Sequence, residues 1–176
     1  MKLQLIVFSG LPGAGKTSVA EAVARELQIP VFAKDWLEGS LLQAGMKFNA
    51  DSTPSLGYFG YELLTTLALQ QLRLSQSVIL DSVASTATIR DTWRALAAEH
   101  SARWRVIECI CSDETIHRGR LVARQRGIPG WHELTWGEIE RVKSYYAPWD
   151  EERLVLDMVD PLENNIQAAL AYLRES

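Results

Sequence analysis

The stretch that decides the fold reads "FSGLPGAGKTSVA" and spans residues 8–20. Within it, residues 10–17, which we call the phosphate loop, fit the pattern G-x-x-x-x-G-K-[ST] at every position. Glycines let the backbone curl until several N–H groups face one anion, and a following helix adds the partial positive charge of its N-terminus. The residues expected to hold phosphates are Gly10, Leu11, Pro12, Gly13, Ala14, Gly15, Lys16, Thr17 and Ser18.

The spacing of the loop indicates which phosphate compound it holds. Lys16 supplies a mobile cation for the outer phosphates, and Thr17 supplies a hydroxyl for Mg²⁺. A dinucleotide-binding loop would need G-x-G-x-x-G, and the sequence that starts at Gly13 fails this pattern because position 18 is serine. A plain glycine-rich turn is the remaining alternative. The loop therefore favours a nucleoside triphosphate, ATP, bound with Mg²⁺.

Short apolar runs alternate along the chain with segments of helical periodicity. Strands are predicted at 3–9, 30–34, 77–83, 102–112 and 153–158, and helices at 16–28, from 35, at 55–74, 85–100, 114–126, 135–147 and 161–175. Strands that alternate with helices imply a parallel sheet covered on both faces, an α/β fold of three layers. We expect one domain over residues 1–176, with its ligands at the carboxyl ends of the strands.

Asp35 follows the second predicted strand directly and is the candidate for a catalytic base. A carboxylate beside the loop can accept the proton of a substrate hydroxyl that attacks the transferred phosphate. The alternative is that Asp35 caps the N-terminus of the helix that follows it.

Asp81 ends the apolar strand "SVILD". A carboxylate in this position lies near the magnesium shell of many ATP-binding proteins, although any strand can end in aspartate. Thr17 and Asp81 are therefore the candidate metal residues.

A basic segment follows the fourth strand and is interrupted by "RGIPGWHELTW" before a new helix begins at a capping box, Thr135 to Glu138. We interpret residues 118–137, approximately, as a lid that closes over phosphates and brings arginines to developing negative charge. The candidate arginines are Arg120, Arg124 and Arg126; a solvated basic helix, with Arg120 and Arg124 on one face, is the alternative. Trp131, His132 and Trp136 are expected to pack or face solvent rather than to line the site.

Composition restricts the partners and the location. The net charge of −4 provides no global basic field for nucleic acid or for an anionic membrane. The N-terminal run lacks the features of a signal peptide, and no apolar run reaches about 18 residues, so the expected location is the cytoplasm. Cys109 and Cys111 are expected to be small buried side chains on one face of a strand, rather than a disulfide or a zinc site.

The loop "GLPGAGKT", the "AKD" after the second strand, the "VILDS" strand, the arginine-rich lid and the final "LVLDMVDPLENNIQAAL" together resemble a known group. They look like the P-loop kinases of the adenylate-kinase-like superfamily. Within it, the resemblance is strongest to small bacterial predicted kinases of the AAA-domain or zeta-toxin-like kind, with chloramphenicol phosphotransferase and the polynucleotide 5′-kinase domain as relatives.

This resemblance implies a five-stranded parallel sheet of order 2-3-1-4-5, ATP with Mg²⁺, and phosphate transfer to a hydroxyl. It also implies that Asp35 resembles the base of these kinases, that Lys16 and Thr17 match their phosphate and magnesium ligands, and that the three arginines fall where lid arginines lie.

The expected activity is thus transfer of the γ-phosphate of ATP to a hydroxyl of a small-molecule acceptor, by a monomer or a homodimer. Two alternatives stay open. The acceptor would be the 5′-hydroxyl of a polynucleotide in the first, which the acidic composition disfavours. In the second, the protein is an ATP-binding switch or ATPase without an acceptor.

Overall fold

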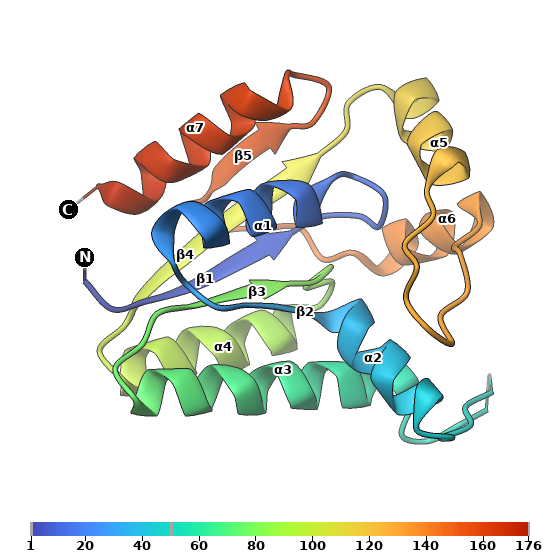
Figure 1. Cartoon of the computed structure of the whole chain (residues 1–176), viewed down its shortest axis with the longest axis horizontal. Coiled ribbons are helices and arrows are strands. Elements are labelled where there is room, and N and C mark those ends of the chain that lie inside the picture. Colours follow the sequence, from blue (N-terminus) through green and yellow to red (C-terminus); the bar gives the residue numbers. More distant parts are fainter. Residues whose placement is uncertain (1, 50, 176) are drawn as a thin grey trace.

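The computed structural model describes residues 2–49 and 51–175, and its centre is a sheet of five parallel strands. The strands are β1 (Gln4–Ser9), β2 (Val31–Ala33), β3 (Val78–Asp81), β4 (Arg103–Ile110) and β5 (Leu154–Asp157). Their spatial order is β2-β3-β1-β4-β5 (Figure 1). This confirms the predicted fold class and the strand order that the resemblance implied.

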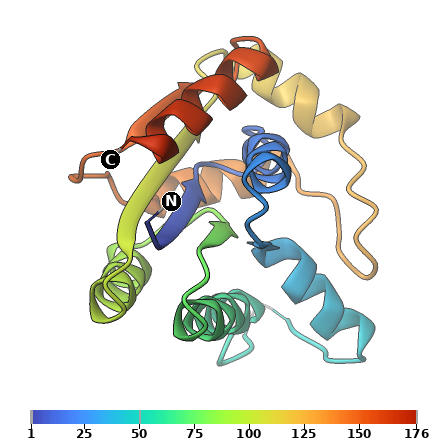
Figure 2. The ribbon, with the colours of Figure 1, turned by 60° about the vertical axis from the view of Figure 1, so that its left-hand side comes forward.

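Helices cover both faces of the sheet, as the apolar strands require. The helices are α1 (Lys16–Leu27), α2 (Lys34–Gln43), α3 (Leu56–Arg73), α4 (Ala87–Glu99), α5 (Glu114–Ala123), α6 (Trp136–Tyr145) and α7 (Leu162–Arg174). Figures 1 and 2 show α1 and α7 on one side of the sheet and α3 and α4 on the other. The fold therefore has the three layers that the sequence predicted.

The central strand β1 divides the core into two apolar layers because its side chains alternate between the faces. Ile6 and Phe8 pack with residues of α1 and α7, whereas Leu5 and Val7 pack with residues of α3 and α4. All four side chains are fully buried. This strand is therefore rigid up to Ser9, which immediately precedes the phosphate loop.

Local signals in the sequence, such as capping residues, correctly predicted where most helices begin. Thr135 and Glu138 form the predicted capping box, in which each side chain accepts a hydrogen bond from the other residue's backbone N–H. Helix α3 is capped by Ser55, whose side chain accepts a hydrogen bond from the Tyr58 amide.

Three expected boundaries were wrong, and each correction affects a candidate residue. Helix α5 ends at Ala123, so Arg124 and Arg126 lie beyond it, and Arg124 is extended. Strand β2 ends at Ala33, and Asp35 is the second residue of α2, where it does not serve as the cap. Strand β4 ends at Ile110, so Cys111 lies outside the strand and is partly exposed, whereas Cys109 is buried as predicted.

None of the helices in the described part of the chain combines the length and the apolar character that a membrane span requires.

Candidate active site

The phosphate loop leaves the sheet in a backbone conformation that suits glycine. Gly10, Gly13 and Gly15 all have positive φ, at 132°, 81° and 102°. Gly10 also lies against β4: a Cβ there would be 2.0 Å from the carbonyl oxygen of Cys109. Glycine is therefore needed at this position for conformation and for space, and the loop closes directly onto the N-terminus of α1.

Lys16, Thr17 and Asp81 meet where β1 and β3 lie side by side. Lys16 is buried, and its Nζ donates a hydrogen bond to the carbonyl oxygen of Leu11 at 3.0 Å. Burial lowers the pKa of Lys16 to about 8, although the nearby Asp81 carboxylate opposes this shift.

The Thr17 hydroxyl donates a hydrogen bond to Oδ2 of Asp81 at 2.6 Å. Burial raises the pKa of Asp81, while Lys16 and the hydrogen bond from Thr17 lower it. A hydroxyl and a buried carboxylate in contact are oxygen ligands of the kind that Mg²⁺ prefers, and a cation would offset the cost of burying the carboxylate. The donor set therefore fits the magnesium ion that the sequence predicted.

A single cavity brings together all the candidate catalytic and metal residues except Arg120. Its walls come from the phosphate loop, the ends of β2 and β3, and the segment between α5 and α6; they are Pro12, Lys16, Thr17, Ala33, Asp35, Asp81, Ser82, Val83, Arg124, Arg126 and Leu134. Its volume of about 40 Å³ has room for one or two water molecules. The segment between α5 and α6 therefore lies close to the phosphate loop.

Residues 124–135, which we call the lid loop, are extended where they enter this cavity. Arg124 and Arg126 are two residues apart in extended chain, so their side chains point to the same side. Arg126 forms an ion pair with Asp35, and the Asp81 carboxylate acts on Arg124. The helix that was predicted to continue to residue 126 would have turned these two side chains apart.

The lid loop also packs along one face of α2. Asp35, Gly39 and Leu42 are spaced by four and three residues, and they face Arg126, Ile128 and Gly130. A Cβ at Gly39 would be 2.4 Å from Cγ2 of Ile128, and one at Gly130 would be 3.2 Å from Cβ of Leu42. Figure 2 shows this loop running beside α2. We call these three pairs the α2 clasp.

Arg120 lies outside the cavity that contains Asp35, Arg124 and Arg126. Its Nη2 donates a hydrogen bond to the carbonyl oxygen of Met158 at 2.7 Å. Together with Gly15, Ser18 and Asp160, it lines a separate cleft beside the phosphate loop. Arg124 follows the end of α5, yet Arg120 and Arg124 also line one cleft together, beside Lys16 and the N-terminus of α1.

Two residues of the site carried weak signals in the sequence. Ser82 is 4% exposed and lines the cavity, and its Oγ has no hydrogen-bond partner within residues 2–49 and 51–175. His117 is buried beneath the loop, with Nε2 2.8 Å from the carbonyl oxygen of Pro12, and Trp136 packs edge-on against its ring. The positions of Ser82 and His117 depend on contacts with residues far away in the sequence, so local patterns could not predict them. Trp136 packs against another side chain, as expected.

Comparison with known proteins agrees with this geometry. The family model described as "AAA domain" (AAA_33) matches residues 5–148 of the chain. The chain belongs to this AAA-domain family. This agrees with the resemblance to proteins of the AAA-domain kind that the sequence showed. A search of curated proteins found no match.

Solved structures with the same fold include three kinases at low sequence identity. A sugar kinase from Janibacter sp. HTCC2649 is 21% identical, with a TM-score of 0.71 over 97% of this chain and 94% of that one. A gluconokinase from Sinorhizobium meliloti 1021 is 18% identical, with a TM-score of 0.70 over 98% and 93%. The APS kinase of Mycobacterium tuberculosis, solved with AMPPNP and APS, is 21% identical, with a TM-score of 0.65 over 99% and 100%. At these identities the likeness establishes the fold.

Proposed function

We propose that the protein transfers the γ-phosphate of ATP to a hydroxyl group of a small molecule. One observation carries this proposal: the carboxylate of Asp35 lines the same cavity as Lys16, Thr17 and Arg124. A nucleotide switch needs a phosphate site but no carboxylate beside it. A phosphotransferase needs both, because the acceptor must lose a proton next to the transferred phosphate.

The donor half of the site is the phosphate loop with the residues around it. Backbone N–H groups of the loop and the ammonium of Lys16 bind the phosphates of ATP. Thr17 and Asp81 hold Mg²⁺, which neutralises charge on the phosphate oxygens when bound. Arg120, in the cleft near Met158 and Asp160, fits the nucleoside end of ATP.

Asp35 acts in the acceptor half of the site. The acceptor oxygen attacks the γ-phosphorus, the bond between that phosphorus and the β–γ bridging oxygen breaks, and ADP leaves. The proton of the acceptor hydroxyl passes to a carboxylate oxygen of Asp35. Asp35 is now paired with Arg126, and phosphates in the cavity would give this arginine a second anionic partner. Arg124 and Arg126 then stabilise the charge of the transferred group.

Several observations favour a small acceptor over a polynucleotide. Ser82 offers a buried hydroxyl without a partner among the described residues, in the wall of the same cavity as Asp35. A buried hydroxyl without a hydrogen-bond partner favours the binding of a ligand or a water that supplies one. The three solved structures are named as kinases of a sugar, of gluconate and of APS. The net charge of −4 gives no basic surface to attract a nucleic acid.

The test begins with the wild-type protein, ATP, Mg²⁺ and pools of hydroxyl-bearing metabolites, nucleosides and 5′-hydroxyl oligonucleotides, with mass spectrometry for a new phosphorylated product. Once an acceptor is found, Asp35→Asn should keep ATP affinity within about twofold and lower turnover by at least about 100-fold. Asp91→Asn, an exposed aspartate on α4, serves as the matched control and should transfer at the wild-type rate.

Transfer at the wild-type rate by Asp35→Asn would refute the role of this carboxylate. If no pool raises ATP consumption above hydrolysis by water, the alternative of a switch or ATPase is favoured instead.

A further inference from the structure

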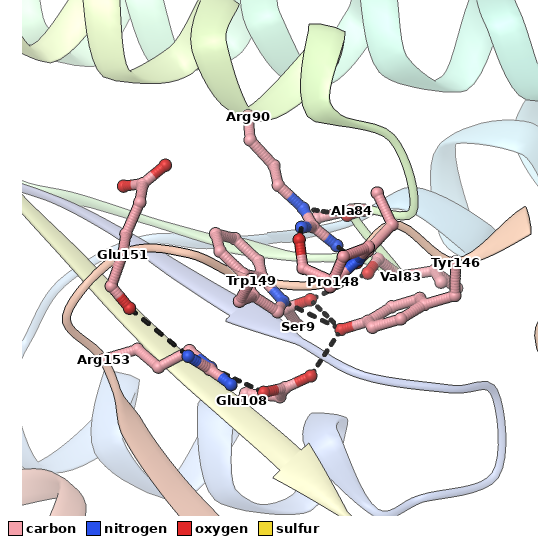
Figure 3. Close-up of polar contacts among 11 residues, drawn as sticks. Ser9, Val83, Ala84, Arg90, Glu108, Tyr146, Pro148, Trp149, Glu151 and Arg153 are labelled. Atoms are coloured by element: carbon pink, nitrogen blue, oxygen red, sulfur yellow. Dashed lines mark hydrogen bonds and ion pairs between the residues drawn. The ribbon is translucent and has the colours of Figure 1, made fainter.

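The hydroxyl of Tyr146 lies at a junction of segments that are far apart in the sequence (Figure 3). It is 3.0 Å from Oγ of Ser9 and donates a hydrogen bond to Oε1 of Glu108 at 2.9 Å. It also accepts a hydrogen bond from Nε1 of Trp149 at 2.9 Å. One phenolic oxygen thus connects the end of β1, the middle of the sheet and the segment after α6.

The charges around this hydroxyl fix the direction of the hydrogen bonds. Nε of Arg153 lies 2.6 Å from Oε2 of Glu108, so the Glu108 carboxylate is a strong acceptor for the Tyr146 proton. The Ser9 hydroxyl donates to the carbonyl oxygen of Val83 at 2.8 Å and meets the Tyr146 oxygen on its other side. The single proton of the Ser9 hydroxyl therefore has two acceptors within reach, the Val83 carbonyl oxygen at 2.8 Å and the Tyr146 oxygen at 3.0 Å, and Ser9 is joined to Tyr146 by a hydrogen bond when it donates to the second.

Ser9 is the residue before Gly10, where the phosphate loop begins. The loop entrance has little freedom, because Gly10 has φ of 132° and its Cα lies against the backbone of Cys109. Any shift of Ser9 is therefore passed to the backbone N–H groups of the loop rather than absorbed at Gly10.

Tyr146 itself belongs to the point where the lid returns to the body of the protein. Arg90 is 3% exposed and donates hydrogen bonds to the carbonyl oxygens of Ala147 and Pro148 at 2.8 and 2.9 Å, and to that of Ala84 at 2.7 Å. Its guanidinium lies 3.7 Å from the centre of the Trp149 ring (Figure 3). Residues 146–149 are thereby fixed, and we call them the lid root.

We propose that Tyr146 is a positioning residue that joins the lid root to the entrance of the phosphate loop and thereby sets the affinity of the loop for nucleotide. The inference rests on the proposed use of this loop to hold ATP. Tyr146 does not contact the cavity that contains Asp35; it acts through Ser9. Removing its hydroxyl would leave Ser9, Glu108 and Trp149 each without one partner.

The test measures the Kd of Mg·ADP by isothermal titration calorimetry, which needs no acceptor. Tyr146→Phe should weaken binding about tenfold, and Ser9→Ala should weaken it in the same way, because both break the same connection. The double variant should be no weaker than the weaker single variant, since the two residues act as a unit.

Two control variants separate positioning from general damage. Tyr145→Phe makes the same change at the preceding residue, whose side chain is 51% exposed, and should bind Mg·ADP like the wild type. Trp93→Phe removes the buried hydrogen bond from Nε1 of Trp93 to Oγ1 of Thr65, which involves none of these residues. It should lower the melting temperature and leave the Kd of Mg·ADP within about twofold of the wild type.

The inference is overturned if Tyr146→Phe binds Mg·ADP with wild-type affinity, or if its loss of affinity is matched by Trp93→Phe at equal loss of stability. If Tyr146→Phe fails to fold, Ser9→Ala replaces it, and its affinity for Mg·ADP is compared with the wild type and with the destabilised control in the same way. A wild-type protein that binds Mg·ADP but phosphorylates no acceptor would refute the proposed transferase and leave this inference standing.

Discussion

Replacing Gly39 by alanine tests whether the α2 clasp holds the lid loop closed. A Cβ at this position would lie 2.4 Å from Cγ2 of Ile128 and 3.3 Å from the carbonyl oxygen of Pro129. Carbon atoms in ordinary contact are about 3.5–4.0 Å apart, so the methyl group of Ile128 must retreat by about 1 Å. Because this methyl is attached directly to Cβ of a stiff, β-branched side chain, the retreat requires the lid loop to move.

The expected magnitude follows from two opposing effects. Alanine favours the helical state of α2 by about 1 kcal/mol relative to glycine, whether the lid is open or closed. Overpacking against Ile128 costs about 1–3 kcal/mol and affects the closed lid alone. The free energy of unfolding should therefore change little, by about 1 kcal/mol or less, whereas the open lid should gain population by a factor of at least about 5.

Limited trypsin digestion, read by mass spectrometry, measures this population because Arg124 and Arg126 are cleavage sites inside the lid loop. Cleavage there should accelerate about 5-fold or more in Gly39→Ala. Gly119→Ala on α5 is the matched control, since a Cβ at Gly119 has nothing within 4 Å. This control should be cleaved at the wild-type rate. Cleavage of Gly39→Ala at the wild-type rate would refute the clasp.

Three further predictions concern the metal, acid stability and thiol reactivity. Asp81→Asn should weaken Mg²⁺-dependent ATP binding about 10-fold or more and leave Mg²⁺-free binding nearly unchanged; equal losses in both titrations would contradict the metal role. Hydrogen bonds from the Thr135 backbone and from His132 lower the pKa of Glu138 from 4.5 to about 2, so its stabilisation is complete above pH 4.5 and is lost as the pH falls toward 2. The destabilisation by Glu138→Ala in urea melts, about 1 kcal/mol at pH 7, should therefore shrink across this range; a constant difference would contradict the assignment. Burial raises the pKa of the Cys109 thiol to about 12, so a thiol reagent should label Cys111 in the native protein and Cys109 after unfolding; rapid native labelling of Cys109 would count against its burial.

Features that depend on neighbouring residues could be predicted from the sequence. The glycines and the lysine of the phosphate loop act through backbone conformation within eight residues, and the capping box joins residues three apart. The alternation of apolar strands with amphipathic helices indicated a covered parallel sheet, because no other arrangement buries both faces of each strand.

The lid loop marks the limit of that reasoning. Arginine and leucine favour a helix, so the local pattern continued α5 to residue 126. The chain leaves the helix at Arg124, and Arg126 then pairs with Asp35, which is far away in the sequence. Helix propensity amounts to only about a few tenths of a kcal/mol per residue, and tertiary contacts routinely override it.

The sequence by itself thus determined that this protein has a phosphate loop between a buried strand and a helix, in a three-layer α/β fold, because those properties follow from residue types at short spacing. The tertiary structure alone decided which charged residues share the cavity, that Arg120 lies outside it, and that Tyr146 reaches Ser9 across 137 residues of chain. These contacts depend on how helices and strands pack against one another. Hydrogen bonds and ion pairs between residues far apart in the sequence produce no periodic pattern of residue types, so the sequence alone does not predict them.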